Sequence, residues 1–302
     1  MREALGRVGR VARWVGPPAL LLVLMARFDL RGVGRHLATL DLRFVAAFLA
    51  LSVVFYVLCA WRWTLIAARL GATLPLRRAV LDYYLSTLLN QVLPVGVGGD
   101  VVRAARHRRR LDARWGPPVL AIALERLSGV LGLSLVVVVS SLVWLAGGER
   151  RFAVALAVVA VAFAITLALL AARPSRFPRL AAILADARRA FVGGGALAAQ
   201  LVASVGAAAV LLVMFACAAR AVGVPLDAPA TLRVVPFVLA VTTIPWAFAG
   251  WGARELSVAA LFGLAGLDPA AGVAASVTFG ALSLVAAAPG LVVLWLPQKG
   301  PA

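Results

Sequence analysis

The sequence predicts an all-α integral membrane protein, a polytopic helix bundle. Hydrophobic residues make up 63% of its 302 residues, and several apolar runs are long enough to cross the roughly 30 Å hydrocarbon core of a bilayer. Almost all of the net charge of +18 comes from arginine, and these arginines separate the apolar runs. That placement favours membrane orientation and contact with anionic headgroups, and we expect no nucleic-acid partner.

An internal repeat is the second observation that predicts the fold. A proline, a glycine and an arginine occur at the same spacing in two places, 151 residues apart: Pro94, Gly99 and Arg103, then Pro245, Gly250 and Arg254. The apolar runs recur near the same shift: 11–26 with 152–172, 44–67 with 197–219, and 116–145 with 270–296. This agreement favours duplication over a chance match of the motif. We therefore predict a single membrane domain over 1–302, with repeat one at about 11–145 and repeat two at about 152–296.

The first apolar runs set the orientation. Four arginines precede residue 17 and place the amino terminus in the cytoplasm. No small-x-small cleavage site follows the run 11–26, so we expect it to remain as the first span. The stretch 28–40 has the spacing of an interfacial helix, and 44–67 predicts the second span. Trp61, Arg62 and Trp63 near its end are typical of an anchor at the headgroup level.

Two segments are too short to cross the bilayer. Residues 80–91 would span about 18 Å as a helix, and arginines flank the segment on both sides. This pattern predicts a re-entrant hairpin that returns to the cytoplasm. Residues 232–244 also stop at a proline and form either a second hairpin or two short crossings. The residues expected to shape the two breaks are Pro94, Gly96, Gly98, Gly99, Pro245, Gly250 and Gly252.

The remaining runs, 116–145, 152–172, 196–219 and 270–296, bring the prediction to about six full spans plus two broken or re-entrant hairpins, hence about eight hydrophobic segments. Five arginines mark residues 173–195 as a cytoplasmic loop, and the carboxyl terminus is predicted to be cytoplasmic. An odd number of full spans between the breaks gives the repeats opposite orientations. Inverted repeats with broken helices are common in transporters, with the substrate near the midplane between the breaks.

Charged residues inside the apolar regions are the candidate functional residues. Glu125 and Arg126 lie about 15 Å into a predicted span, where each isolated charge would cost about 2.5–3.5 kcal/mol. Such charges must pair, contact water or lie nearer the interface. They either only hold helices together or line a polar cavity in which arginines bind an anionic group, because guanidinium matches phosphate oxygens. The candidate substrate-binding residues are Asn90, Asp100, Arg103, Glu125, Arg126, Arg254 and Glu255.

Signatures of enzymes and metal sites are missing from the sequence. It has no HExxH motif and no paired-acid motif, and Cys59 and Cys217 have no evident partner for a metal. We expect no catalytic residue, no metal, no cofactor and no enzymatic activity. One alternative stays open, a membrane-embedded transferase that uses Asp100 or Glu125 as a base. Asp100 also has the place of a helix N-cap after Gly98 and Gly99.

Taken in order, these motifs resemble the lysylphosphatidylglycerol synthase transmembrane-region family, also called flippase-like domain proteins. The motifs that carry the resemblance are Asn90-Gln91-x-Leu93-Pro94, Gly98-Gly99-Asp100-x-x-Arg103, Glu125-Arg126, Ile244-Pro245 and Gly250-x-Gly252-x-Arg254-Glu255. The resemblance implies a polytopic protein that moves aminoacylated phosphatidylglycerol, other phospholipids or polyprenyl-linked sugars across the cytoplasmic membrane. In bifunctional relatives a soluble aminoacyl transferase domain follows. The chain printed here ends at Ala302, so we expect no such domain and no synthesis of lysyl lipid.

Together these arguments predict a lipid flippase of the cytoplasmic membrane that accepts an anionic or pyrophosphate headgroup. Arg103 and Arg254 would contact phosphate, while Asp100, Glu125 and Glu255 would hold those arginines. The expected partners are the lipid substrate and anionic lipids at the basic loops, and a separately encoded glycosyltransferase or lipid synthase is a further candidate partner. The alternatives are a non-transporting subunit that docks such an enzyme and a transporter of small solutes or ions.

Overall fold

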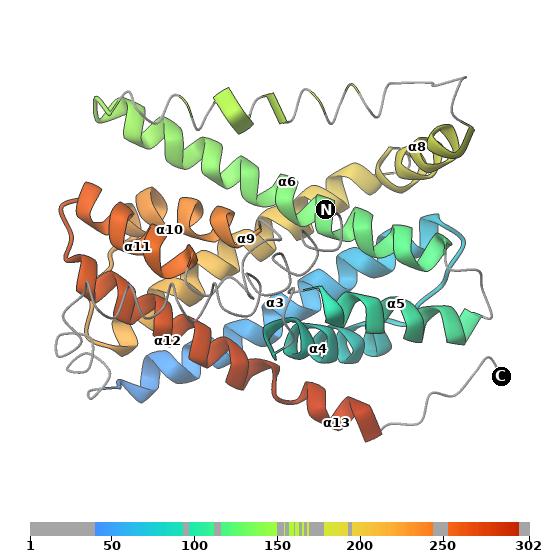
Figure 1. The fold of residues 1–302 in the computed structure, drawn as a ribbon, viewed down its shortest axis with the longest axis horizontal. Coiled ribbons are helices and arrows are strands. Elements are labelled where there is room, and N and C mark those ends of the chain that lie inside the picture. The colour runs from blue at the N-terminus through green and yellow to red at the C-terminus, as the bar shows by residue number, and fades with distance from the viewer. Residues whose placement is uncertain are drawn as a thin grey trace, which may run out of the picture. The chain divides into compact units, whose positions relative to one another are not determined.

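The described part of the chain is helical throughout its regular structure (Figure 1). The computed structural model describes residues 40–92, 97–111, 116–149, 178–192, 195–243 and 253–295, with scattered positions between 154 and 168. Its helices are α3 (Leu42–Arg69), α4 (Leu76–Val92), α5 (Gly98–Leu111), α6 (Gly116–Ala146), α8 (Pro178–Phe191), α9 (Ala196–Ala221), α10 (Ala228–Thr242), α11 (Ala253–Leu264), α12 (Pro269–Ala287) and α13 (Gly290–Trp295).

Among the described residues, four helical stretches are long and apolar enough to cross a membrane, so the protein is a multi-pass membrane protein. They are Leu42–Arg69, Gly116–Ala146, Ala196–Ala221 and Pro269–Val293, and each overlaps a predicted span. The predicted first span at 11–26 and the interfacial helix at 28–40 lie outside the described residues, as does most of the span at 152–172. The total number of spans therefore remains a prediction.

The helices recur along the chain in the order that duplication predicts. The paired helices α3 and α9, α4 and α10, α5 and α11, and α6 and α12 begin at residues 42 and 196, 76 and 228, 98 and 253, and 116 and 269. These starting points are 152 to 155 residues apart, close to the motif shift of 151. The duplication itself remains a prediction. The opposite orientation of the two repeats remains a prediction.

The chain divides into two compact units, and each unit takes segments from both halves of the sequence. Unit 1 consists of residues 1–53, 85–99 and 211–291, and unit 2 of residues 54–84, 100–210 and 292–302. In unit 1, α11 packs between α10 and α12 (Figure 1). The Phe279 ring of α12 lies 5.6 Å from the Phe48 ring and 5.5 Å from the Phe215 ring, measured between centroids.

The segment 173–195, predicted as a loop, contains a helix that packs in the core of unit 2. This helix is α8, and it contacts α6. Leu184, Ala187 and Phe191 of α8 are buried, and Phe191 belongs to the same apolar cluster as Trp63 and Leu124. Leu180 and Ile183 remain exposed. Helix α8 is therefore amphipathic and packs into the core of unit 2. The sequence analysis did not predict this helix, because the segment is rich in arginine and alanine.

Aspartate and proline mark two helix starts, as their chemistry requires. The side chain of Asp227 accepts a hydrogen bond from the Ala230 N–H at 2.7 Å and caps α10. Asp268 caps α12 in the same way and is followed at once by Pro269, whose missing N–H costs nothing in the first turn. The helix in the last predicted span, 270–296, therefore begins at Pro269.

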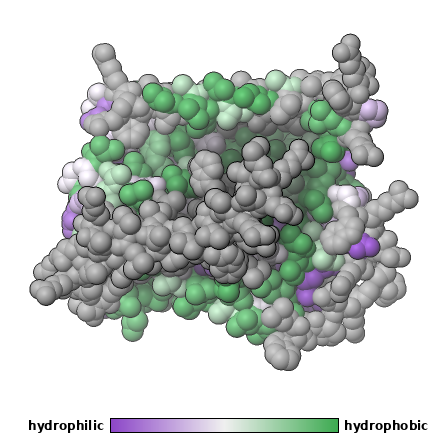
Figure 2. All heavy atoms as spheres, viewed as in Figure 1, coloured by the Kyte–Doolittle hydropathy of each residue, from purple (hydrophilic) through white to green (hydrophobic). Residues whose placement is uncertain are grey.

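The described surface is apolar where lipid would lie. Figure 2 shows hydrophobic residues over much of the visible described face, with hydrophilic residues toward its left and right edges. Large apolar side chains are exposed along the long helices, among them Val53, Val139, Leu142 and Val202. Exposed apolar area of this extent is typical of a surface that contacts acyl chains.

The first helix break lies between α4 and α5. Gly98 and Gly99 belong to the first turn of α5, whereas Pro94 and Gly96 lie outside the described residues, as do Pro245, Gly250 and Gly252 of the second break. Glycine is needed at 99 because a Cβ there would lie 1.9 Å from the Ser86 carbonyl oxygen. The close approach of α5 to α4 therefore depends on a residue without a side chain.

Candidate functional site

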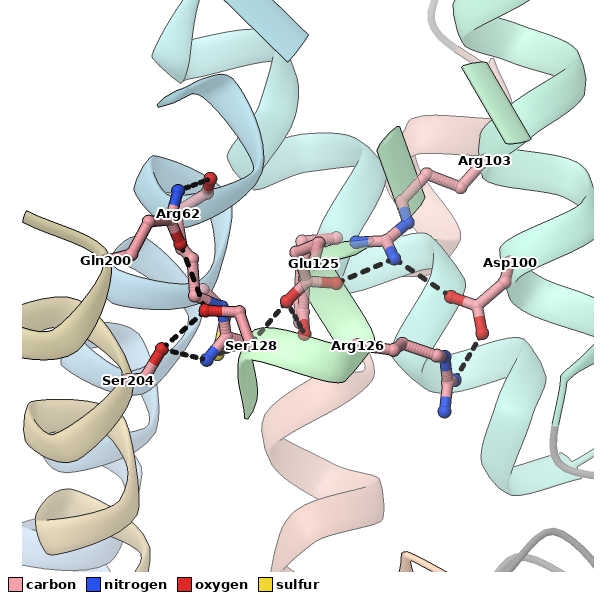
Figure 3. Close-up of polar contacts among 10 residues, drawn as sticks. Arg62, Asp100, Arg103, Glu125, Arg126, Ser128, Gln200 and Ser204 are labelled. Carbon is pink, nitrogen blue, oxygen red and sulfur yellow. Dashed lines mark hydrogen bonds and ion pairs between the residues drawn. The ribbon is translucent and has the colours of Figure 1, made fainter. Parts of the chain in front are cut away.

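A buried carboxylate, Glu125 of α6, is the centre of the strongest polar cluster in the described part of the chain (Figure 3). Glu125 is fully buried and forms ion pairs with two arginines from other helices, Arg62 of α3 and Arg103 of α5. The Arg103 Nη2 donates to Glu125 Oε2 at 3.0 Å, and the Tyr83 hydroxyl donates to Oε1 at 3.4 Å. Side chains from α3, α4 and α5 thus meet at one carboxylate of α6.

Arg103 is held by two acids and by two aromatic rings. Its Nη2 also donates to Asp100 Oδ1, at 3.1 Å. The Cζ carbon lies 4.7 Å from the ring centroid of Trp63 and 4.7 Å from that of Tyr83, within the range of cation–π attraction. The Arg103 side chain is only 1% exposed, so the guanidinium has exchanged nearly all of its hydration for these contacts.

Asp100 connects the buried arginine to a more exposed one. It pairs with Arg103 and also with Arg126 of α6, whose side chain is 49% exposed. Asp100 lies within the first turn of α5, so its predicted role as N-cap is wrong. The amide side chain of Asn90 does part of that work, since its Oδ1 accepts a hydrogen bond from the Gly99 N–H at 2.8 Å.

On the other side of Glu125 the polar contacts continue into three long helices. Arg62 Nη1 donates to Ser204 Oγ at 3.3 Å, and the Ser204 hydroxyl lies 2.8 Å from the Ser128 hydroxyl. Ser128 donates to Gln200 Oε1 at 3.0 Å. Gly132 allows α6 and α9 to meet here, because a Cβ there would lie 2.5 Å from Ser204 Cβ. Figure 3 shows this row of side chains from Gln200 to Arg126.

The predicted interfacial anchor at 61–63 is therefore wrong for two of its three residues. Arg62 is 4% exposed and Trp63 is fully buried. Arg62 does not extend toward headgroups because Glu125 lies within reach and offers a full opposite charge. An arginine inside an apolar helix is costly unless it is paired, and the partner is 63 residues away in sequence. No local pattern in the sequence identifies it.

The cluster carries more positive charge and more donors than it can satisfy. Arg62, Arg103 and Arg126 face two carboxylates, Asp100 and Glu125, so the formal sum is one positive charge. In the described structure the Arg62 Nε, the Trp63 Nε1 and the Nε and Nη1 of Arg103 are buried without a hydrogen-bond partner. All four atoms are donors, whereas one acceptor of the cluster, Asp100 Oδ2, also has no hydrogen bond and forms an ion pair with Arg126 instead. A group rich in acceptor oxygens and negatively charged would complement these donors.

A second buried ion pair, in unit 1, repeats part of this arrangement. Arg254 of α11 is the counterpart of Arg103 at the 151-residue shift, and Ser276 of α12 is the counterpart of Glu125. Arg254 Nε donates to Ser276 Oγ at 2.8 Å, and Arg254 Nη2 donates to Glu255 Oε1 at 2.8 Å. Both copies thus join an arginine of the short helix to the next long helix. The second pair carries no net charge.

The structure places the seven predicted site residues in three groups. Asp100, Arg103, Glu125 and Arg126 form one cluster. Arg254 and Glu255 form a separate pair in unit 1, and Asn90 contacts the backbone of α5 rather than a charged group. The sequence analysis missed the residues that complete the cluster, namely Arg62, Trp63, Tyr83, Ser128, Gln200 and Ser204.

The comparisons with known proteins give one match. The model of the family described as "Lysylphosphatidylglycerol synthase TM region" matches residues 10–290, which includes both helix breaks and every residue of the cluster. No curated protein and no solved structure matches the chain. The resemblance found from the sequence motifs is therefore confirmed over nearly the whole chain.

Proposed function

This chain belongs to the lysylphosphatidylglycerol synthase TM region family, and from that membership we propose that it is a lipid transporter of the cytoplasmic membrane. Its substrate is an anionic phospholipid or a polyprenyl-linked lipid, whose headgroup crosses the membrane while its tails stay in the bilayer. The lipid leaves chemically unchanged. The cluster around Glu125, which we call the arginine cluster (Arg62, Asp100, Arg103, Glu125, Arg126), binds the phosphate.

The observation that carries this proposal is the surplus of buried donors and positive charge. Two acids face three arginines, and two nitrogens of Arg103 have no hydrogen-bond partner among the described residues. A cluster that only held helices together would be more stable if its charges balanced and its donors were satisfied. A phosphate supplies both the missing negative charge and the missing acceptors, and guanidinium groups bind it through two parallel hydrogen bonds.

The route to the cluster supports the same function. Arg126 is half exposed while Arg103 is buried, and Asp100 contacts both. A headgroup that arrives from the exposed side meets Arg126 first and Arg103 second. The break before α5 supports an anion at this place, because the amino terminus of a short helix carries a partial positive charge. Inverted repeats would then expose the site to each leaflet in turn.

Arg103 and Arg254, which the sequence analysis predicted to have the same role, have different surroundings. Arg254 contacts the carboxylate of Glu255 and the hydroxyl of Ser276, whereas Arg103 belongs to a cluster in which three arginines pair with two carboxylates. We propose that phosphate binding rests mainly on the arginine cluster and that the Arg254 pair stabilises unit 1. The same substitution at the two positions therefore separates transport from folding.

The test is lipid exchange in liposomes. The purified protein is reconstituted with a fluorescent anionic phospholipid, and the label in the outer leaflet is destroyed by a membrane-impermeant quencher. We expect the parent to accelerate exchange, and Arg103→Gln and Arg126→Gln to slow it about tenfold, the effect of losing one charge-assisted hydrogen bond. Arg189→Gln is the matched control, because Arg189 pairs with Asp186 on the surface of α8.

Equal exchange by the parent and both cluster variants, in folded protein, would contradict this assignment. Absence of exchange with several phospholipids and a polyprenyl phosphate would favour the alternative, a subunit that docks a separate enzyme. One observation favours that alternative specifically: α8, in the predicted cytoplasmic loop, exposes the large apolar side chains of Leu180 and Ile183. Such a surface is typical of a site that contacts a protein or the membrane surface.

A further inference from the structure

We propose that Asp100 and the phosphate compete for Arg103 and Arg126, and that the headgroup displaces Asp100 from both arginines during each transport cycle. This inference rests on the proposed function and deepens it. It assigns Asp100 a role as an internal competitor that sets how tightly an anionic phosphate is held and how readily it is released. Without such a competitor, a site built to attract phosphate would retain it.

Three sources of positive charge converge on Asp100. Its Oδ1 accepts a hydrogen bond from Arg103 Nη2 at 3.1 Å, and its Oδ2 pairs with Arg126 Nη2. Asp100 also lies in the first turn of the fourteen-residue helix α5, where exposed N–H groups and the helix dipole favour an anion. Figure 3 shows the carboxylate between the two arginines, on the side of Arg103 away from Glu125. A carboxylate there has the position and the charge of one edge of a phosphate.

Unused donors show that Asp100 fills this position only in part. Arg103 is 1% exposed, yet its Nε and Nη1 have no hydrogen-bond partner in the described structure. A carboxylate has two oxygens, and those of Asp100 are shared between two arginines. A phosphate offers more acceptor oxygens around one atom, so it can engage a second nitrogen of Arg103 while keeping the contact with Arg126.

Glu125 does not fit the same role. It is fully buried, with both oxygens engaged by Arg62 and Arg103 and a third contact from Tyr83. Moving it would leave Arg62 buried without its carboxylate partner and would leave Arg103 with Asp100 alone. The Asp100 side chain is 12% exposed and its second partner is half exposed, so Asp100 can turn outward with little loss. The two acids thus divide the work: Glu125 holds Arg103 in place, and Asp100 yields its position.

The test compares binding with exchange in Asp100→Asn, which removes the charge and keeps the shape. Binding of dihexanoyl phosphatidylglycerol to the full chain in detergent is measured by titration calorimetry, with inorganic phosphate as a second probe that lacks the lipid part. We expect Asp100→Asn to bind the lipid about fivefold more tightly, the upper effect of losing a partly exposed ion pair. Exchange in liposomes should slow, because release becomes harder.

The matched control is Asp186→Asn, because Asp186 forms an ion pair with Arg189 three residues later, as Asp100 does with Arg103. It lies on the surface of α8, and the expected change in binding and exchange is nil. If Asp100→Asn does not fold, Asp100→Ser replaces it, since serine also removes the charge and has a smaller side chain.

Unchanged or weaker lipid binding by the folded Asp100 variant would overturn the inference and leave the proposed function intact. Failure of both Asp100 variants to fold would also overturn it, because Asp100 would then be a structural partner. If the parent binds neither probe and exchanges no lipid, the proposed function itself fails. Binding of inorganic phosphate without the lipid would assign the site to a soluble anion and would refute lipid transport.

Discussion

Replacing Glu125 with glutamine should destabilise the protein strongly, although the two side chains have nearly the same shape. The substitution leaves Arg103 with Asp100 alone, and it leaves Arg62 with only neutral partners, such as Ser204 at 3.3 Å. Arg62 is 4% exposed. Breaking a buried ion pair by removing one partner costs about 3–5 kcal/mol. That is a large part of the roughly 5–15 kcal/mol that separates folded from unfolded states of ordinary domains.

The assay is the free energy of unfolding in mixed micelles, titrated with a denaturing detergent for the parent and for Glu125→Gln. Asp186→Asn is the control, because that exposed pair should contribute no more than about 1 kcal/mol. The double variant Arg62→Gln, Glu125→Gln should lose less than the sum of the two single variants, since it removes both charges together. A Glu125→Gln protein within about 0.5 kcal/mol of the parent would refute a buried ion network.

Three further predictions follow from single contacts. Gly99→Ala should cost about 1–3 kcal/mol, because its Cβ would lie 1.9 Å from the Ser86 carbonyl oxygen; parental stability in the same titration would contradict the close approach. Asp227→Ala should lose about 1 kcal/mol with the cap of α10, and Asp227→Asn should retain most of it; equal losses in both would exclude capping. A cysteine at Ala185, exposed on α8 within the loop 173–195, should react with an impermeant maleimide from the cytoplasmic side only; labelling from outside would reverse the predicted orientation.

The sequence predicted which charged residues need a partner. The cost of isolated charges in hydrocarbon required that Glu125, Arg103 and Arg254 find partners, and each has one. Which partner each would take was not predictable. Arg62 looked like an anchor because tryptophans flank it near the end of an apolar helix, a pattern that a buried arginine and an interfacial arginine share.

The positions of the long helices were easier to predict from the sequence than the ion pairs. Apolar length alone located α3, α6, α9 and the span that begins with α12, because hydrocarbon thickness imposes a minimum length on a crossing helix. Helix α8 escaped detection because its buried face is short and alanine-rich. Such a helix is stabilised by the surface it packs on, and that surface is assembled from Trp63, Leu124 and other residues far away in sequence.

By itself, the sequence determined a multi-pass helical membrane protein, its family, the recurrence of its helices and the residues whose charge needed an explanation. These properties follow from composition, length and spacing, which act locally along the chain. Helix packing, in contrast, places Glu125 between two arginines and joins Arg103 to Arg126 through Asp100. Electrostatic partners are chosen by distance in space, and helix packing sets that distance.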